Sequence, residues 1–124
     1  MATYTITPIK ESVAAGEGYA YSSEIPVSGI LARLFIHFPP GCAGLVDVAA
    51  GVRTGGQDLW LVPARTGTYI ALDNVTYTFY PNEPVRRGDK LWAHILNADT
   101  TFTHTITVSG EVEAEGNLID LGQW

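Results

Sequence analysis

Residues 85–112 read VRRGDKLWAHILNADTTFTHTITVSGEV, and this stretch decides the fold. The turn tripeptide Arg87-Gly88-Asp89 precedes an apolar segment at 91–96, and a polar break at 97–99 reverses the chain. A second segment, 102–108, alternates between two faces, with Phe102, His104, Ile106 and Val108 on one and Thr101, Thr103, Thr105 and Thr107 on the other. A period of two in β-branched and aromatic residues indicates β-strands. We therefore expect a hairpin in which the second strand returns beside the first.

The rest of the chain repeats this pattern between frequent turn signals. Seven further segments are predicted to be strands, at residues 3–9, 19–23, 30–38, 45–52, 59–62, 69–72 and 75–80. Residues 10–18 are predicted to form a loop, and no segment has the 3.6-residue period of a helix. Short strands at this spacing predict an all-β, antiparallel two-sheet β-sandwich of about 8–9 strands, jelly-roll-like or immunoglobulin-like. Residues 1–116 would form a single sandwich domain, followed by an apolar C-terminal arm at 117–124.

The composition narrows the function classes. The net charge is −6, from 7 Lys and Arg against 13 Asp and Glu, so no dominant basic face can form and nucleic acid is not an expected partner. No apolar run has the length of a membrane span, and the N-terminus lacks the pattern of a secretory signal. A membrane partner is therefore not expected, and the protein is expected to stay in the reducing cytoplasm of the producing cell or to be released only by lysis. The single cysteine, Cys42, cannot form an internal disulfide and is predicted to be buried.

Segment 30–38 predicts an interface. Ile30, Ala32, Leu34, Ile36 and Phe38 share the face that we assign to the core, and Leu31, Arg33, Phe35 and His37 share the other. The second face is half apolar, more than a solvated face needs. We expect Leu31, Phe35 and His37 to lie under a loop or against another subunit. The apolar residues of the arm (Leu118, Ile119, Leu121 and Trp124) are expected to dock on the protein itself or on a neighbour.

No segment carries a strong metal signature. The histidines His37, His94 and His104 lack the short spacing of a zinc site, although the last two lie on adjacent predicted strands. A blue-copper site needs a cysteine near its second histidine, but Cys42 lies far before His94 in the sequence. Asp73 and Asn74 lack the acidic loop that calcium requires. We therefore expect no metal and no cofactor.

Enzymatic and recognition motifs are equally sparse. G-x-S-x-G, P-loop and dinucleotide motifs are absent, and Asp47, beside small residues, is the one carboxylate that we would name for a small hydrolase. Arg87-Gly88-Asp89 is the tripeptide that integrins recognise, but it fits a turn before a strand. Asn74-Val75-Thr76 is a glycosylation sequon, expected to be unmodified without a secretory signal. The sequence therefore predicts a protein that is not an enzyme.

Aromatic residues on the predicted strands suggest an alternative. They are Trp60, Tyr69, Tyr77, Tyr80 and Trp92. If buried, these side chains are core; if exposed together, they would stack on sugar rings. The alternative function is a carbohydrate-binding module that uses Trp60, Tyr80 and Trp92.

Four short motifs carry a resemblance to a known group. They are FPPGCAGLVDV at 38–48, GTYIALD at 67–73, NEPVRRGDKLW at 82–92 and HTITV at 104–108. Over about half of the chain, this order resembles small jelly-roll or β-sandwich proteins of tailed bacteriophages, the capsid decoration and accessory virion proteins. The resemblance implies a structural protein without catalytic residues that self-associates, often as a homotrimer. It also implies binding to a capsid or another large assembly at the virion surface.

Overall fold

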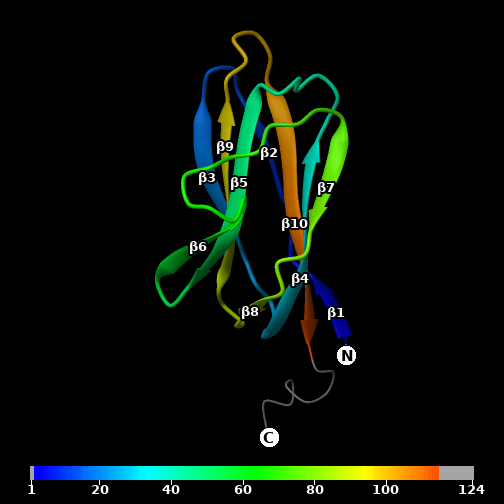
Figure 1. Cartoon of the computed structure of the whole chain (residues 1–124), viewed down its shortest axis with the longest axis vertical. Helices are drawn as coiled ribbons and strands as arrows, with labels where there is room; N and C mark the ends of the chain where they lie inside the picture. The colour runs from blue at the N-terminus through cyan, green and yellow to red at the C-terminus, as the bar shows by residue number, and fades with distance from the viewer. Residues whose placement is uncertain (1, 115–124) are drawn as a thin grey trace, which may run out of the picture.

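The computed structural model describes residues 2–114, and these form ten β-strands and no helix. The strands are β1 (Ala2–Thr5), β2 (Ile9–Val13), β3 (Gly18–Glu24), β4 (Gly29–Phe38), β5 (Val46–Thr54), β6 (Gln57–Val62), β7 (Val75–Phe79), β8 (Glu83–Val85), β9 (Lys90–Asn97) and β10 (His104–Ala114). They make two antiparallel sheets (Figure 1). The predicted all-β, two-sheet sandwich is confirmed.

The strands pair in a nested order. β2 pairs with β10, β3 with β9, β4 with β7, and β5 with β6. The chain thus resembles one long hairpin, folded so that the first sheet has the order β2-β10-β4-β7 and the second has the order β3-β9-β5-β6. This arrangement is a jelly roll, as predicted. The two short strands extend the first sheet, with β1 beside β10 and β8 beside β4.

The predicted hairpin between segments 91–96 and 102–108 is wrong. β9 pairs with β3 and β5 in the second sheet, whereas β10 belongs to the first sheet. Residues 98–103 therefore form an arch between the sheets, at the apex in Figure 1. A period of two shows that each strand has an inward and an outward face, but it does not identify the strand's partner.

Buried polar side chains hold this arch. The Asn97 side-chain amide donates to the carbonyl oxygens of Val13 and Phe102, at 2.9 Å each. The Asp99 carboxylate accepts from the Thr101 amide and is 2.8 Å from the His104 Nε2. Because these polar groups are buried, the contacts between them replace hydrogen bonds to water.

The core lies between the sheets. Its largest fully buried side chains are Phe38, Ile6, Ile25, Leu31, Leu34, Ile36, Leu91, Ile95, Ile106, Val13, Val46 and Val48. Each such apolar side chain contributes about 1.5–3 kcal/mol on burial. Cys42 is also fully buried, as predicted, and burial raises the pKa of its thiol.

A β-bulge changes the predicted faces of β4. The register against β10 shifts between Glu111 and Val112, opposite the start of β4. As a result, Leu31 is fully buried and Ile30 is exposed, the reverse of the prediction, because an extra residue in one strand reverses the direction of its neighbours. Leu31 is therefore part of the core and not of a surface. Beyond the bulge the predicted alternation is confirmed, with Phe35 and His37 half-buried on the outward face.

Four other predicted segments differ from the structure. The predicted strand at 3–9 is divided, since β1 ends at Thr5 and β2 begins at Ile9. The predicted loop at 10–18 contains most of β2, whose alternation is hidden because the charged Glu11 stands between the buried Ile9 and Val13. The predicted strand at 69–72 is reduced to a bridge between Ile70 and Val48. The predicted strand at 102–108 begins at His104 and continues to Ala114, and Phe102 is an exposed residue of the arch.

Candidate functional site

The outward face of the second sheet carries a cluster of aromatic rings over two small residues. Ala49 and Gly51 of β5 pair with His94 and Trp92 of β9. A Cβ atom on Gly51 would lie 2.6 Å from Cζ2 of Trp92 and would also overlap the Leu59 carbonyl oxygen. Glycine therefore allows the Trp92 indole to lie close against the sheet, and the side chain is only 5% exposed although it points outward.

The aromatic rings contact one another across three elements. The ring centroids of Trp60 and Trp92 are 4.9 Å apart, and those of Trp92 and His94 are 4.6 Å apart. The Tyr69 ring is edge-on to the Trp60 ring, with the two centroids 5.8 Å apart. The Trp60 indole nitrogen also donates a hydrogen bond to the Thr68 carbonyl oxygen. These contacts fix the rings in place, since aromatic pairs in such tilted arrangements add to the stability gained by burial.

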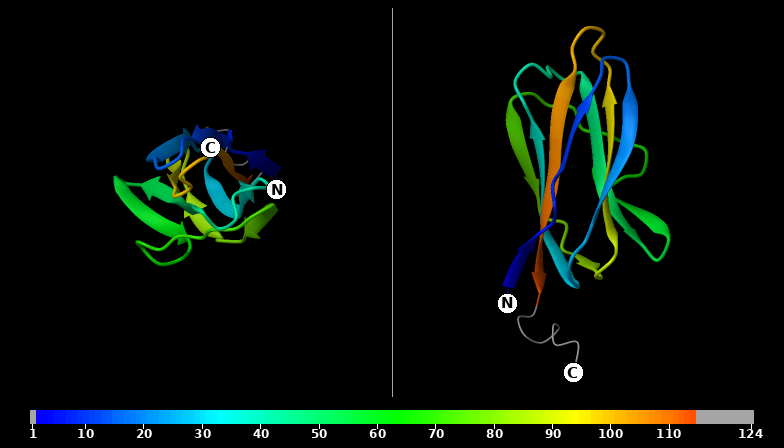
Figure 2. Two further views of the ribbon diagram at one scale, coloured as in Figure 1. Left: turned by 90° about the horizontal axis from the view of Figure 1, so that it is seen from above. Right: turned by 180° about the vertical axis from the view of Figure 1, so that it is seen from behind.

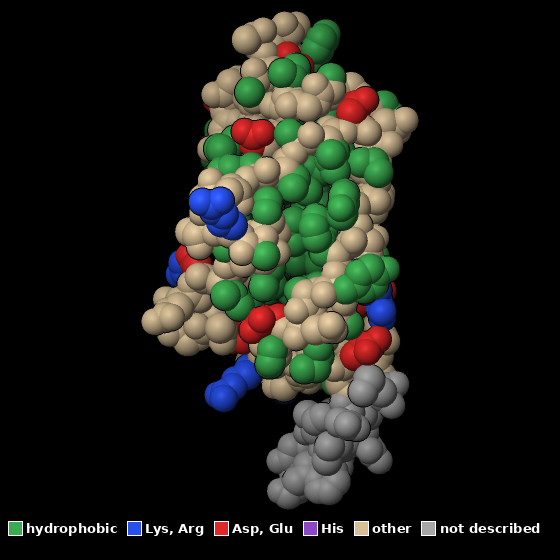
Figure 3. Space-filling view, in the orientation of Figure 1, with side chains coloured by type: hydrophobic (Ala, Val, Ile, Leu, Met, Phe, Trp, Pro, Cys, Tyr) green, Lys and Arg blue, Asp and Glu red, His purple; other side chains and the backbone are tan. Residues whose placement is uncertain are grey.

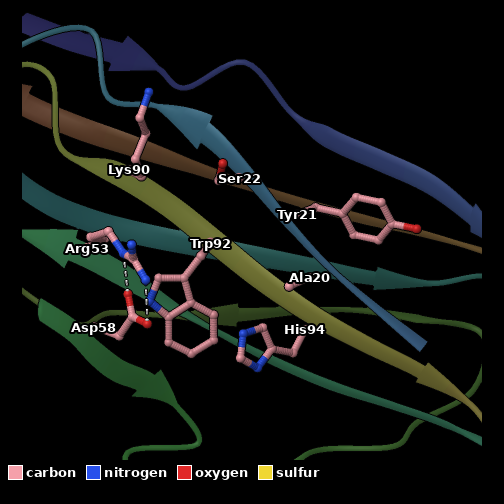
Figure 4. A pocket seen from close by; sticks show the side chains of 8 residues that line it. All are labelled: Ala20, Tyr21, Ser22, Arg53, Asp58, Lys90, Trp92 and His94. Carbon is pink, nitrogen blue, oxygen red and sulfur yellow. Dashed lines mark hydrogen bonds and ion pairs between the residues drawn. The ribbon is translucent and has the colours of Figure 1, made fainter. Parts of the chain in front are cut away.

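A pocket of about 360 Å³ opens beside this cluster. It is lined by Ala20, Tyr21, Ser22, Arg53, Asp58, Lys90, Trp92 and His94 (Figure 4). The Arg53 guanidinium donates two parallel hydrogen bonds to Asp58, from Nε to Oδ1 at 2.7 Å and from a terminal nitrogen to Oδ2 at 3.0 Å. The pocket therefore combines an apolar side with a fixed pair of opposite charges.

A tight turn places this ion pair. The glycines at 55 and 56 both have positive φ, 59° and 79°, and join β5 to β6. Positive φ at both central residues is typical of two-residue hairpins. Arg53 and Asp58 are consequently direct cross-strand partners.

The electrostatics of the pocket favour binding over proton transfer. The hydrogen bonds from Arg53 lower the pKa of Asp58, which stays ionised at neutral pH and is a weak proton acceptor. The Lys90 Nζ is 3.6 Å from Oε1 of Glu24, so the Glu24 carboxylate balances the charge of Lys90. The pocket presents donors and acceptors with almost no net charge.

One pocket group lacks a partner. The indole nitrogen of Trp92 is buried and makes no hydrogen bond to any residue that the structure describes. In Figure 4 this nitrogen is on the side of the ring that faces Arg53 and Asp58. An indole N–H can only donate, so an acceptor in the pocket would satisfy it.

A second surface lies where the sandwich opens. Val75, Tyr77 and Phe79 of β7 pair with Phe38, Ile36 and Leu34, so they share the inward face of the first sheet. Nevertheless Val75 is 39% exposed and Tyr77 45% exposed. Figure 2 shows the sheets diverging toward β6 and β7, and Figure 3 shows apolar side chains gathered in a depression there. We call this surface the open edge; it consists of Leu59, Leu61, Ile70, Leu72, Val75, Tyr77 and Phe79.

The structure separates the residues predicted for glycan binding. Trp60 and Trp92 meet on the second sheet, but Tyr80 follows β7 in the first sheet and is exposed there. Since Trp92 is almost fully covered, its ring face is not open for stacking, although the residue forms part of the pocket wall.

The residues predicted for the interface are also dispersed. Phe35 and His37 lie on the outward face of the first sheet, where His37 Nδ1 is 2.8 Å from the Thr76 hydroxyl. Leu31 is in the core. The predicted arm residues Leu118, Ile119, Leu121 and Trp124 lie outside the described residues.

The three histidines lie in three different places. His37 and His94 are on different sheets, and His104 contacts Asp99 in the arch. Within residues 2–114, no three His, Cys, Asp or Glu side chains are close enough together to hold a metal ion. Asp73 accepts from the amides of Gly41 and Ala43, at 2.9 Å each, and so orders the loop before β5.

Two smaller sequence features have clear positions. In the Arg87-Gly88-Asp89 segment, the Asp89 carboxylate accepts from the Arg86 amide at 2.9 Å, which makes a turn before β9 as predicted. Asp47 lies half-buried on β5 opposite Leu96. In the described part of the chain, no helix has the length and apolarity that a membrane span requires.

Fold and site together define an all-β jelly-roll protein with a ligand-sized pocket on one sheet and an apolar open edge. No protein-family model matches the chain. No curated protein matches it either. A crystal structure of FLHE aligns with 91% of this chain and 97% of that chain, at 9% sequence identity and a TM-score of 0.49.

Proposed function

We propose that the protein is a non-enzymatic structural protein that self-associates and attaches to a larger protein particle through its open edge. The observation that carries this proposal is the exposure of Val75 and Tyr77, which lie on an inward sheet face. Exposed apolar surface costs about 25 cal/mol per Å² relative to burial. A contiguous apolar depression on a small domain is typical of a surface that a partner covers.

The backbone at the open edge supports the same proposal. Within residues 2–114, β6 pairs on one side only, with β5, and β7 pairs on one side only, with β4. Edge strands of this kind can accept another strand, from a second copy or from a partner. The open edge therefore offers both apolar area and unpaired backbone groups.

The kind of assembly follows from the sequence resemblance. Jelly rolls occur in viral capsid domains, lectins and cupins, so the fold alone does not choose a function. The resemblance to phage decoration and accessory virion proteins makes a capsid the proposed particle. A closed homo-oligomer, which we propose to be a trimer, would bind it, because closed symmetry prevents unlimited growth. The proposed location is the virion surface, or the cytoplasm of the producing cell before release.

A charge at the open edge tests this proposal. We expect Tyr77→Glu to reduce the oligomer mass of the full chain in light scattering and to abolish co-sedimentation with capsids, because a carboxylate would have to be desolvated in the interface. Phe102→Glu is the matched control. It adds the same charge at an exposed aromatic residue of the arch and should change neither result.

The proposal fails if the wild-type chain is monomeric and binds no capsid. It also fails if the two variants behave alike, because the added charge and not its position would then explain the effect.

A further inference from the structure

The pocket on the second sheet has the dimensions of a small-ligand site. Its volume of about 360 Å³ lies at the lower end of the range of about 300–1,000 Å³ typical for such sites. Its residues come from four strands, with Ser22 on β3, Arg53 on β5, Asp58 on β6 and Trp92 on β9. Because a sheet positions all four, the pocket is a rigid feature of the fold and not a gap in a loop.

Its polar groups are arranged for a ligand with neighbouring hydroxyls. The two hydrogen bonds to Asp58 use two of the five N–H donors of Arg53, and the carboxylate keeps further lone pairs. A donor and an acceptor therefore lie side by side. Each hydroxyl of a vicinal pair can donate to the carboxylate and accept from the guanidinium, so the ion pair matches a sugar edge.

The Trp92 indole nitrogen supplies the third contact once a ligand displaces the side chains that cover it, because this nitrogen is buried in the ligand-free protein. A buried donor without a partner costs about 1–3 kcal/mol, which a ligand acceptor would recover. Hydroxyl and ring oxygens of a sugar are suitable acceptors. The remaining lining, from Ala20 and His94, gives an apolar side against which the C–H groups of a sugar ring can pack.

The charge of the pocket selects among ligands. The cations Arg53 and Lys90 are both matched by carboxylates, from Asp58 and Glu24. An anionic ligand would therefore approach Asp58 without a free cation to compensate. A neutral ligand avoids this repulsion.

From these observations we propose that the pocket binds one neutral sugar ring. Trp92 donates to an oxygen of the ring or its hydroxyls, and the Arg53–Asp58 pair holds two adjacent hydroxyls. This binding activity goes beyond the proposed assembly role and is independent of it, because the pocket lies on the outward face of the second sheet and the open edge lies between the sheets. Trp92 acts as a donor here, not as a stacking platform.

The test is a titration of the full chain, labelled with ¹⁵N, against the methyl glycosides of glucose, galactose, mannose and N-acetylglucosamine. The indole N–H resonance of Trp92 reports directly on the proposed contact. We expect at least one glycoside to shift this resonance in a saturable manner. Inorganic phosphate and acetate form the anionic arm and should bind more weakly. A glycan array then shows whether the same sugar is also recognised at the end of a longer chain.

Two variants and a control locate the site. Trp92→Phe keeps an aromatic ring but removes the donor, and it should weaken binding by about tenfold, as expected for one buried hydrogen bond. Asp58→Asn keeps the shape but removes the charge and one acceptor, and it should have a similar effect. Tyr80→Ala removes an exposed aromatic residue of the first sheet and should leave affinity unchanged.

Three results would overturn the proposal. One is that no glycoside shifts the Trp92 resonance. Another is that phosphate or acetate binds more tightly than every sugar, which would indicate an anion site. The third is that Asp58→Asn binds normally. Asp58 is partly exposed, so this variant remains informative even if Trp92→Phe does not fold.

Discussion

Gly51 shows how one residue determines a surface. Without a side chain at this position, the Trp92 indole lies against β5 and forms part of the pocket wall. The sequence shows small residues on this face of segment 45–52. Which ring fills the space depends on the β9-β5-β6 order, which the alternation of residues along each strand does not reveal.

We expect Gly51→Ala to lower the free energy of unfolding by about 1–3 kcal/mol, because the added methyl overlaps Trp92 and the Leu59 carbonyl. Trp fluorescence should change as well, since the indole must move. Urea unfolding followed by fluorescence and by circular dichroism measures both effects.

Gly44→Ala is the control for this substitution. Its added Cβ meets no atom within 4 Å, but its φ of 75° strains an L residue. It should destabilise the protein without altering the native Trp spectrum. A native spectrum of Gly51→Ala identical to that of wild type would contradict the packing argument.

Arg53 and Asp58 are site residues that the sequence reading missed, although a signal for them exists. They flank the segment Thr54-Gly55-Gly56-Gln57, which the sequence predicts to be a turn. Two glycines at the centre of a two-residue hairpin fix the register, and the register sets these residues opposite each other. Ser22 and Lys90 carry no comparable signal, because their neighbours come from strands distant in the sequence.

The arch between β9 and β10 is the element in which sequence and structure disagree most. Both strands were recognisable from their alternation, and the break at 97–99 was visible. A short polar break is typical of a hairpin as well as of an arch. In this protein the polar side chains favour the arch. The Asn97 side chain donates to the Val13 carbonyl oxygen of β2, and the Asp99 carboxylate accepts from the Thr101 amide and contacts His104.

The arch predicts a specific acid sensitivity. The hydrogen bond with His104 and those from the Thr101 and Phe102 amides lower the pKa of Asp99 below its ordinary value of 3.8. A carboxyl with a lower pKa in the folded protein stabilises it above the unfolded pKa, and this contribution disappears as the pH falls through the folded value. We therefore expect Asp99→Asn to lower the melting temperature at pH 7.

The difference in melting temperature between wild type and Asp99→Asn should shrink as the pH falls below about 4. Calorimetry from pH 2 to pH 7 measures it. A difference that stays constant over this range would show that the ionised form of Asp99 is not the stabilising one.

The β4 bulge limits what alternation can predict within an element. From Arg33 to Phe38 the inward and outward residues are as expected, whereas Ile30 and Leu31 are exchanged. The extra residue, Ala32, leaves no clear mark in the sequence, because Ile30, Leu31 and Ala32 are all apolar. Leu31 therefore does not belong to the predicted interface. The exposed apolar residues Leu59, Val75 and Tyr77 lie instead on β6 and β7.

At the scale of the molecule, the pocket and the open edge divide the surface into two regions of different chemistry. The open edge is apolar and bordered by free strand edges, which suits another protein chain. The pocket is polar and rigid, which suits a small molecule. A protein attached to a particle through the open edge would keep the outward face of the second sheet available.

The nested pairing has a consequence for how the chain folds. The innermost pair, β5 and β6, is joined by a turn of two glycines. In contrast, β2 and β10 pair although nearly the whole described sequence separates them. Loop closure becomes more costly as the separation grows, and folds with mostly non-local pairs fold in about milliseconds to seconds. We expect the amides of β5 and β6 to gain protection first in pulse-labelled hydrogen exchange, and those of β2 last. Simultaneous protection of both pairs would show instead that the sandwich forms in a single step, with the ends of the chain already together.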